Sequence, residues 1–208
     1  MITKFHDSRS NAASPDGDQL NASAAKTRIQ GLESLVAAAR ADRLPPVEAW
    51  DPPYCGDIGM AIRADGTWTY QGSPIGRQAM VKLFARILRK DADGRTWLVT
   101  PVEKVDVAVA DAPFLAVEME IEGAGAAQTV VLRTNVDDIV RVGPDHPLRF
   151  EREAATDGVK PYVLVRGRLE ALVTRAVMFD LVALAEPAMI GGRAVLAVRS
   201  GGTLFAIG

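Results

Sequence analysis

A repeat within the chain constrains its fold more than any other feature of the sequence. Residues 75–98 align without a gap on residues 173–196, at a constant offset of 98 positions. Seven of the 24 aligned positions are identical, namely Arg77/Arg175, Met80/Met178, Leu83/Leu181, Ala85/Ala183, Gly94/Gly192, Arg95/Arg193 and Leu98/Leu196. The order of the expected elements also matches, so the sequence predicts a duplicated unit of hairpin, helix, Gly-Arg turn and strand. The alternative is two unrelated α+β segments with generic patterning.

The hydrophobic periodicity predicts the elements of each copy. In the first copy a β-hairpin turns at Asp65-Gly66, and residues 72–90 show the i, i+3, i+4, i+7 spacing of a helix with one buried face. In the second copy a hairpin turns at Gly167, and residues 174–186 show a helical pattern. The other strands are predicted at residues 95–100, 103–109, 114–122, 129–135, 193–200 and 203–208. The sequence therefore predicts an α+β fold of two β-rich halves, each with one main helix.

Three further features define the predicted domain organisation. The N-terminal residues are rich in Ser, Asn, Asp and Gly, which predicts a disordered tail. An apolar stripe at helical spacing then predicts an N-terminal helix that ends before Pro45 and Pro46. Pro101 lies inside a strand pattern and predicts the passage between the halves. The predicted domains are a tail at 1–22, an N-terminal helix (about 23–43) with the first subdomain at 23–102, and a second subdomain at 103–208.

Composition excludes several classes of function. The formal net charge of −2 gives no electrostatic reason to expect nucleic acid or an anionic membrane as a partner, and no apolar run is long enough to span a membrane. A single cysteine forms no internal disulfide, which favours the reducing cytoplasm. No GxxxxGK[ST] or GxSxG motif occurs, so nothing indicates a P-loop ATPase or an α/β-hydrolase. We therefore expect a cytoplasmic protein.

Cys55, in the stretch WDPPYCGDIGM, is the only cysteine and the first candidate for chemistry. A reactive thiolate needs a nearby histidine, cation or helix N-terminus, but Asp57 lies two residues away and His146 is the one histidine outside the N-terminal tail. One cysteine and one such histidine do not make a closed zinc site, although carboxylates are available for Mg²⁺ or Ca²⁺. We expect Cys55 to be a small buried residue in the wall near a site, and the cofactor question stays open.

Arg77 and Arg175 occupy matching positions at the start of the two repeated helices. A cation there opposes the helix dipole and costs roughly a few tenths of a kcal/mol, so we expect a nearby negative charge to offset this cost. One explanation is a local carboxylate. The other is an anion held jointly by the guanidinium and the free N–H groups of the helix, which would suit a phosphate-bearing ligand.

Residues 45–208 resemble family 1285 of the bacterial domains of unknown function. The stretches that carry the resemblance are PPVEAWDPPYCGDI, DGTWTYQGSPIGR, TPVEKV, DAPF, RTNV, GPDHPLRF and the closing SGG hairpin. The resemblance implies two domains with internal duplication, a C-terminal half similar to a pleckstrin-homology barrel, and a site between the domains for a nucleotide-like ligand, with a link to signalling. The polar positions that it implies for this site are Cys55, Asp57, Arg77, Thr100, Glu103, Lys104, Asn135, Asp145 and His146.

We therefore predict a cytoplasmic, regulatory small-ligand-binding protein with its site between the halves. In this hypothesis Arg77 binds an anionic group, and Cys55 and Asp57 line the wall. The residues that orient the rest of the ligand are Glu103, Lys104 and Asn135. Two alternatives stay open. One is an enzyme with Cys55 as nucleophile, or with Asp57 and Glu103 as acid and base, and the other is a protein-interaction module that uses an exposed sheet edge.

Overall fold

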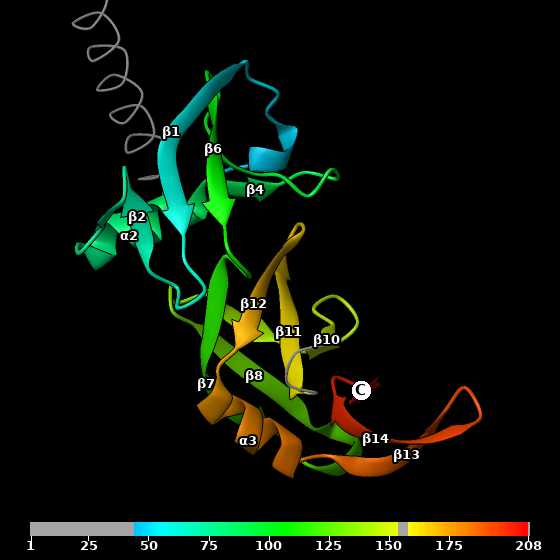
Figure 1. Ribbon diagram of the computed structural model, residues 1–208. Helices are drawn as coiled ribbons and strands as arrows, with labels where there is room; N and C mark the ends of the chain where they lie inside the picture. The colour runs from blue at the N-terminus through cyan, green and yellow to red at the C-terminus, as the bar shows by residue number, and fades with distance from the viewer. Residues whose placement is uncertain (1–43, 154–157, 208) are drawn as a thin grey trace, which may run out of the picture.

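The computed structural model describes residues 44–153 and 158–207 (Figure 1). The predicted tail (1–22) and N-terminal helix (23–43) lie outside the described residues. The described helices are α2 (Gln78–Arg86) and α3 (Arg175–Ala183), with 3-10 turns η1 (Val47–Ala49) and η2 (Gly125–Ala127). Figure 1 shows two bodies of β-sheet, with α2 beside the first and α3 beside the second.

A six-stranded sheet forms the first half. Its strands are β1 (Tyr54–Ile62), β2 (Trp68–Tyr70), β3 (Ser73–Pro74), β4 (Leu88–Lys90), β5 (Thr96–Val99) and β6 (Lys104–Val109). They lie in the order β3-β2-β1-β6-β5-β4, and all neighbours are antiparallel except β1 and β6, which run parallel. The predicted Asp65-Gly66 turn joins β1 to β2, with Gly66 at φ 79°. Because β1 and β6 are parallel, their first residues lie side by side.

The first half has its own core, and the segment around η1 is hydrogen-bonded to its sheet. The helix α2 buries one face, from which the Phe84 ring stacks on Trp68 of β2 with 6.3 Å between centroids. The segment around η1 is held by Arg89 of β4, whose buried guanidinium donates to the carbonyl oxygens of Val47 (2.9 Å) and Trp50 (2.6 Å). Charge-assisted hydrogen bonds of this kind satisfy a buried cation without a ligand.

The second half contains two sheets. The larger one comprises β7 (Phe114–Glu122), β8 (Thr129–Thr134), β9 (Ile139–Arg141), β10 (Leu148–Glu153), β11 (Gly158–Arg166) and β12 (Leu169–Val173). Its order is β10-β11-β12-β7-β8-β9, and β12 runs parallel to β7. The smaller one comprises β13 (Glu186–Ile190), β14 (Arg193–Ser200) and β15 (Thr203–Ala206). The helix α3 packs on β7 and buries Val177 and Leu181.

The structure confirms the α+β class and the two duplicated β-rich halves. In each half the repeated helix is followed by a hairpin, so that α2, β4 and β5 correspond to α3, β13 and β14. The repeated Gly-Arg pair lies at the turn of each hairpin, as Gly94-Arg95 in the first and Gly192-Arg193 in the second. The similarity of the C-terminal half to a pleckstrin-homology barrel stays a prediction.

Both repeated helices are shorter than predicted. The helical pattern of residues 72–90 continues past the end of α2 at Arg86, but Leu88 instead opens β4 and pairs with Leu98 of β5. In the second copy α3 ends at Ala183, and Glu186 opens β13. Sheet pairing that buries Leu88 therefore replaces the last helical turn, because tertiary packing overrides local periodicity.

The passage between the halves lies later in the chain than the predicted division after residue 102. The strand β6 pairs with β1 on one side and β5 on the other, so it belongs to the first sheet. Pro101 marks the short turn that leads into β6 and not the passage itself. Strand pairing places the passage between β6 and β7.

Candidate functional site

Five of the nine predicted site residues lie together at one end of the first sheet. They are Cys55 and Asp57 in β1, Thr100 and Glu103 in the turn before β6, and Lys104 at the start of β6. Figure 1 shows that the starts of β1 and β6 lie at the end of the sheet away from the second half. These five residues therefore do not assemble at the face between the halves, where the sequence predicted them.

A bulge in β1 places Tyr54 and Asp57 on one face of the sheet. Tyr54 pairs with Lys104 and Asp57 pairs with Asp106, so three steps along β1 match two steps along β6. Gly56, inside the bulge, has φ 96°, a left-handed conformation that favours glycine. Regular alternation would put Tyr54 and Asp57 on opposite faces, so periodicity alone does not reveal this pair.

An aromatic and cationic cluster occupies this face. We call it the Tyr54 cluster, and its members are Tyr54, Arg95, Trp97, Lys104 and Asp106. The rings of Tyr54 and Trp97 meet edge to face with 5.5 Å between centroids. The Arg95 guanidinium lies 4.1 Å from the centroid of the Trp97 ring and 5.6 Å from that of Tyr54. Lys104 Nζ lies 5.3 Å from the Trp97 centroid, so both cations lie within cation–π range.

Asp106 links the phenol of the cluster to its guanidinium. It accepts a hydrogen bond from the Tyr54 hydroxyl and another from Arg95 at 2.8 Å. The hydrogen bond to Asp106 raises the pKa of Tyr54 above its ordinary value, and the same carboxylate raises the pKa of Arg95. Tyr54 is therefore a neutral donor and Arg95 a cation at physiological pH.

Trp97 forms the floor of the cluster and Tyr54 its exposed wall. The Trp97 side chain is 3% exposed, and its Nε1 has no hydrogen-bond partner among the residues that the structure describes. Tyr54 is 51% exposed. A fixed ring below an exposed ring offers apolar area on which a planar group can stack.

A hollow of about 310 Å³ adjoins the cluster. Its lining includes Asp57, Arg95 and Asp106, so hydrogen-bond acceptors and a cation face the same space. Lys104, at the start of β6, has no ion pair within residues 44–153 and 158–207. The arrangement can therefore stack a ring, accept hydrogen bonds from it and attract an anionic group.

Cys55 is exposed, contrary to the prediction that it is buried. Its Sγ lies 3.7 Å from the carbonyl oxygen of Pro53. Thr100 is buried and organises the turn before β6. Its Oγ1 accepts hydrogen bonds from the N–H groups of Val102 (3.3 Å) and Glu103 (3.1 Å).

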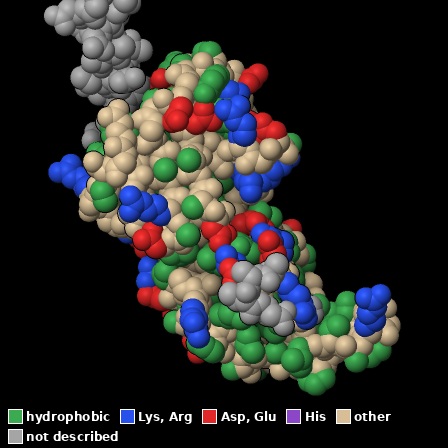
Figure 2. Space-filling model, in the orientation of Figure 1, with side chains coloured by type: hydrophobic (Ala, Val, Ile, Leu, Met, Phe, Trp, Pro, Cys, Tyr) green, Lys and Arg blue, Asp and Glu red, His purple; other side chains and the backbone are tan. Residues whose placement is uncertain are grey.

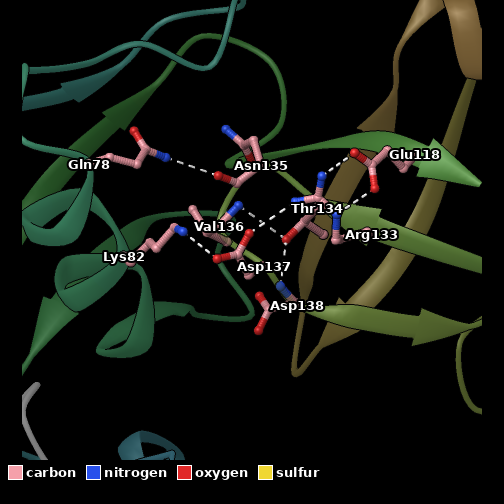
Figure 3. A network of polar contacts seen from close by, with 9 residues as sticks. All are labelled: Gln78, Lys82, Glu118, Arg133, Thr134, Asn135, Val136, Asp137 and Asp138. Atoms are coloured by element: carbon pink, nitrogen blue, oxygen red, sulfur yellow. Dashed lines mark hydrogen bonds and ion pairs between the residues drawn. The ribbon is translucent and has the colours of Figure 1, made fainter.

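Asn135 lies where the two halves meet, in contact with the residue that follows Arg77 (Figure 3). Gln78, which follows Arg77, donates from Nε2 to the Asn135 carbonyl oxygen at 3.0 Å. The Asn135 side chain accepts the Leu115 N–H at 3.0 Å, and a Cβ added at Gly66 would lie 3.0 Å from Asn135 Nδ2. Asn135 is thus engaged in the contact between the halves. Arg77 is exposed and has no ion pair in the part of the chain that the structure describes.

A chain of ion pairs crosses the same contact (Figure 3). Lys82 of α2 pairs with Asp137, and Arg133 joins Asp137, at 3.0 Å, to Glu118. The hydrogen bond from Lys82 holds the pKa of Asp137 below its ordinary value, so this carboxylate stays charged near neutrality. The charges at this end of α2 neutralise one another without a ligand.

Arg166 makes a second link between the halves. Its guanidinium pairs with Asp138, donates to the Ala85 carbonyl oxygen at 2.7 Å and lies 4.9 Å from the centroid of the Phe114 ring. A cavity of about 270 Å³ beside it is lined by residues from both halves, among them Lys82 and Asp137. Because Lys82, Asp137, Asp138 and Arg166 are already paired, this region fits a joint better than a ligand site.

Asp145 and His146 lie in the second half, in the turn between β9 and β10. His146 Nδ1 lies 3.0 Å from the carbonyl oxygen of Leu164, and Asp145 is exposed. Cys55 belongs to the first half, so the structure does not bring Cys55 and His146 together as nucleophile and base.

Comparison with known proteins assigns the family. Residues 45–112 match the family model described as "Domain of unknown function (DUF1285), N-terminal domain", and residues 113–207 match "Protein of unknown function (DUF1285), C-terminal domain". The chain belongs to the DUF1285 family. The predicted resemblance is thereby confirmed, and the two family domains meet between β6 and β7, as the strand pairing does.

Two solved structures of DUF1285 family proteins are similar to this chain. The protein from Silicibacter pomeroyi DSS-3 is 42% identical over 85% of this chain and 93% of its own, with a TM-score of 0.78. The protein from Shewanella baltica OS155 is 28% identical over 61% of this chain and 91% of its own, with a TM-score of 0.49. No curated protein matches the chain.

Two further structural tests concern membranes and metals. No helix among the described residues is long and apolar enough to cross a membrane. Across 44–153 and 158–207, no group of three or more His, Cys, Asp or Glu side chains is placed to hold a metal ion.

The sequence missed four members of the Tyr54 cluster. Tyr54 lies in the stretch that drew attention to Cys55, and Arg95 lies in the repeated Gly-Arg turn, but neither was predicted to be a site residue. Trp97 and Asp106 are direct partners across β5 and β6. Two local signals were available, since Tyr54 lies three residues before Asp57 and Trp97 lies two residues after Arg95, but the parallel pairing of β1 and β6 that unites these segments is not visible in one sequence.

Proposed function

We propose that this protein binds a small ligand with a planar ring and an anionic group, such as a nucleotide, at the Tyr54 cluster. The observation that carries the proposal is an exposed tyrosine ring edge to face with a buried tryptophan, with Arg95 over both rings and Lys104 over the tryptophan, beside a hollow lined by Asp57 and Asp106. The site lies at the outer end of the first sheet and not at the joint between the halves. A regulatory role for this binding belongs to the same proposal.

Each group in the cluster has a distinct role in this proposal. The ring of the ligand stacks on Tyr54 and is held against Arg95, an arrangement worth about 0.5 to 1.5 kcal/mol beyond the area buried. Asp57 accepts hydrogen bonds from the ring or its hydroxyl groups. Lys104 attracts the anionic group, since no carboxylate among the described residues pairs with it.

The enzyme alternative has less support from the geometry. Cys55 is exposed, but His146 lies in the other half against Leu164. In the structure Asp57 is a hydrogen-bond acceptor within its own strand, since its Oδ1 accepts the Gly59 N–H at 2.7 Å. An exposed thiol without a positioned base is a weak basis for a nucleophile.

Thermal shift against a panel of nucleotides and phosphorylated metabolites tests the proposal. A ligand at about 100 times its Kd adds about 2.7 kcal/mol of stability, which raises the Tm of a protein of this size by several degrees. We expect a hit whose shift disappears in Tyr54→Ala and shrinks in Lys104→Gln. Arg77→Ala is the matched control, because Arg77 is an exposed arginine next to Gln78 at the joint between the halves.

The control also separates the two possible positions of the site. A shift that survives Tyr54→Ala but disappears in Arg77→Ala would move the site to the joint between the halves and contradict the proposal. A panel without any shift would contradict ligand binding of this class altogether.

A further inference from the structure

The repeat shows which surfaces of the second half lack a partner. In α2 the residues Val81 and Phe84 face the core of the first half. Their equivalents at the offset of 98 are Phe179 and Val182 of α3, and these are exposed, Phe179 by 65% of its surface. The helix α3 instead buries Val177 and Leu181 against β7. It therefore carries a second apolar face that nothing in the described chain covers.

The hairpin that follows α3 shows the same contrast. We call β13 and β14 up to Ala197 the arm. Leu98 is fully buried in β5, whereas its equivalent Leu196 is 53% exposed in the arm. The residues Pro187, Met189, Ala194 and Leu196 share one face of the arm, as the register shows, and all four are exposed. Figure 1 shows the arm projecting from the body with its tip away from α3, and Figure 2 shows hydrophobic side chains along it.

The free edge of the arm is not suited to strand addition. Gly191 and Gly192, at φ 58° and 79°, form a two-residue turn, so Ile190 and Arg193 exchange both backbone hydrogen bonds. Alternate residues of β13 then turn their backbone groups outward, and one of these is Pro187, which has no N–H. Proline at an open edge opposes pairing with another strand. The arm is thus suited to packing through its apolar face.

A groove beside α3 is the complementary surface. It has a volume of about 480 Å³, and its lining is mostly apolar, with Leu172, Met178 and Phe179 among the members, but it also contains the charged residues Glu153, Lys160 and Arg175. The Arg175 guanidinium lies 5.8 Å from the centroid of the Phe179 ring. In the first half the corresponding residues of the helix and the hairpin, such as Phe84 and Leu98, belong to the hydrophobic core, whereas in the second half both surfaces are exposed and available to cover each other.

The charges on the two surfaces are also complementary. Arg193 lies at the tip of the arm and Asp180 lies on α3, next to Phe179. Both are exposed, and neither has an ion pair within the part of the chain that the structure describes. A cation at the end of an apolar arm and an anion beside an apolar groove favour one orientation of docking.

We propose that two copies of this chain exchange arms, so that the apolar face of each arm packs in the α3 groove of the other copy. In this exchange the exposed face of α3 and the exposed face of the arm cover each other between molecules. Because the two copies exchange both arms about one two-fold axis, the contact is isologous and closes as a dimer. This inference does not depend on the ligand proposed for the Tyr54 cluster.

Sedimentation equilibrium of the full chain tests the exchange. We expect a monomer–dimer equilibrium whose Kd rises roughly tenfold or more in Met189→Glu, on the arm, and in Phe179→Glu, on the groove. Both side chains are exposed, so both variants should keep the fold, which circular dichroism checks. Ile139→Glu in β9 is the matched control because Ile139 is 55% exposed outside both surfaces, and its dimer should persist.

Mixing the two variants tests reciprocity. A Met189→Glu chain keeps its groove and a Phe179→Glu chain keeps its arm, so the mixture should regain one of the two contacts and form a heterodimer. Charge reversal is a second check, since Asp180→Arg and Arg193→Asp should each weaken the dimer and together restore it.

Three outcomes would overturn the proposal. They are a wild-type chain that stays monomeric at about 100 μM, a dimer whose Kd is unchanged by both glutamate substitutions, and a mixture of the two variants that does not form a heterodimer. A monomer whose groove binds decanoate or anilinonaphthalene sulfonate, with loss in Phe179→Glu, would assign the groove to a small amphipathic anion instead of a second copy.

Discussion

The two repeated hairpins differ more than any other corresponding parts of this molecule. The hairpin of β4 and β5 forms one end of a six-stranded sheet and is almost fully buried, whereas the hairpin of β13 and β14 extends from a three-stranded sheet into solvent. Their sequences retain identical residues at Gly-Arg and Leu. The comparison shows that a repeated sequence unit fixes the order helix, strand, turn, strand, while the surrounding strands decide whether the unit becomes core or surface.

The largest expected effect contrasts two equivalent leucines. Leu98→Ala should cost about 2 to 5 kcal/mol of unfolding free energy, because it leaves a cavity at a fully buried position. Leu196→Ala, at the matching exposed position, should stay within about 0.5 kcal/mol in dilute solution. Urea denaturation followed by circular dichroism measures both. Equal costs would mean that the arm is packed and would remove the contrast between the hairpins.

A smaller effect concerns the link between the halves. Arg166→Met should cost about 2 to 3 kcal/mol, because it leaves the Asp138 carboxylate and the Ala85 carbonyl group at the joint without their donor. Arg168→Met, two residues along the same hairpin turn and exposed, is the control. Urea denaturation gives the cost, and faster proteolysis between β6 and β7 in Arg166→Met alone would locate it at the joint. Unchanged stability would mean that the halves are held by other contacts.

The smallest effect contrasts two tyrosines, one in each half. Burial, aided by a 2.7 Å hydrogen bond to Asp111, raises the pKa of Tyr162 to about 12. A phenol whose pKa is raised in the folded state stabilises the fold below its ordinary pKa of 10.0, and this contribution disappears as the pH rises from 10 through 12. We therefore expect stability to fall over that range by roughly 1 to 2 kcal/mol.

Tyr162→Phe should flatten this alkaline loss, as urea midpoints between pH 9 and 12 would show. Tyr54→Phe should flatten it less, because Tyr54 is exposed and solvent screens the hydrogen bond to Asp106 that raises its pKa. Absorbance near 295 nm follows the phenolates directly. A native Tyr162 that titrates at pH 10 would contradict the burial argument.

Sequence periodicity sufficed for elements whose partners are near in the chain. The Asp65-Gly66 hairpin and the buried face of α2 follow from local spacing, and the repeat follows from alignment of the chain with itself. The failures are also repeated, since in both copies the predicted helix runs past its observed end, through β4 in the first copy and as far as Glu186, the first residue of β13, in the second. Leu88 fits the helical pattern and the strand equally well, so only its long-range pairing with Leu98 decides.

The candidate site was harder to predict because it depends on a bulge and a parallel pair of strands. The family resemblance supplied Asp57 and Lys104. Tyr54 and Asp106 join them on the same face of the sheet because the bulge at Gly56 shifts the register of β1 against β6. Asn135 lies between the halves, but its carbonyl oxygen accepts a hydrogen bond from Gln78 and its side chain accepts one from Leu115. Position along the chain does not show whether a polar group is already satisfied.

The position of Trp97 makes the protein its own optical sensor. Indole emission responds to nearby charge, and this ring lies beneath Arg95 and close to Lys104, whereas Trp68 is enclosed in the core against Phe84. Any anion that draws either cation away from the ring changes the field on that one indole. Ligand binding at the Tyr54 cluster can therefore be followed without a label, as a shift in the wavelength of tryptophan emission. Trp97→Phe should remove this shift.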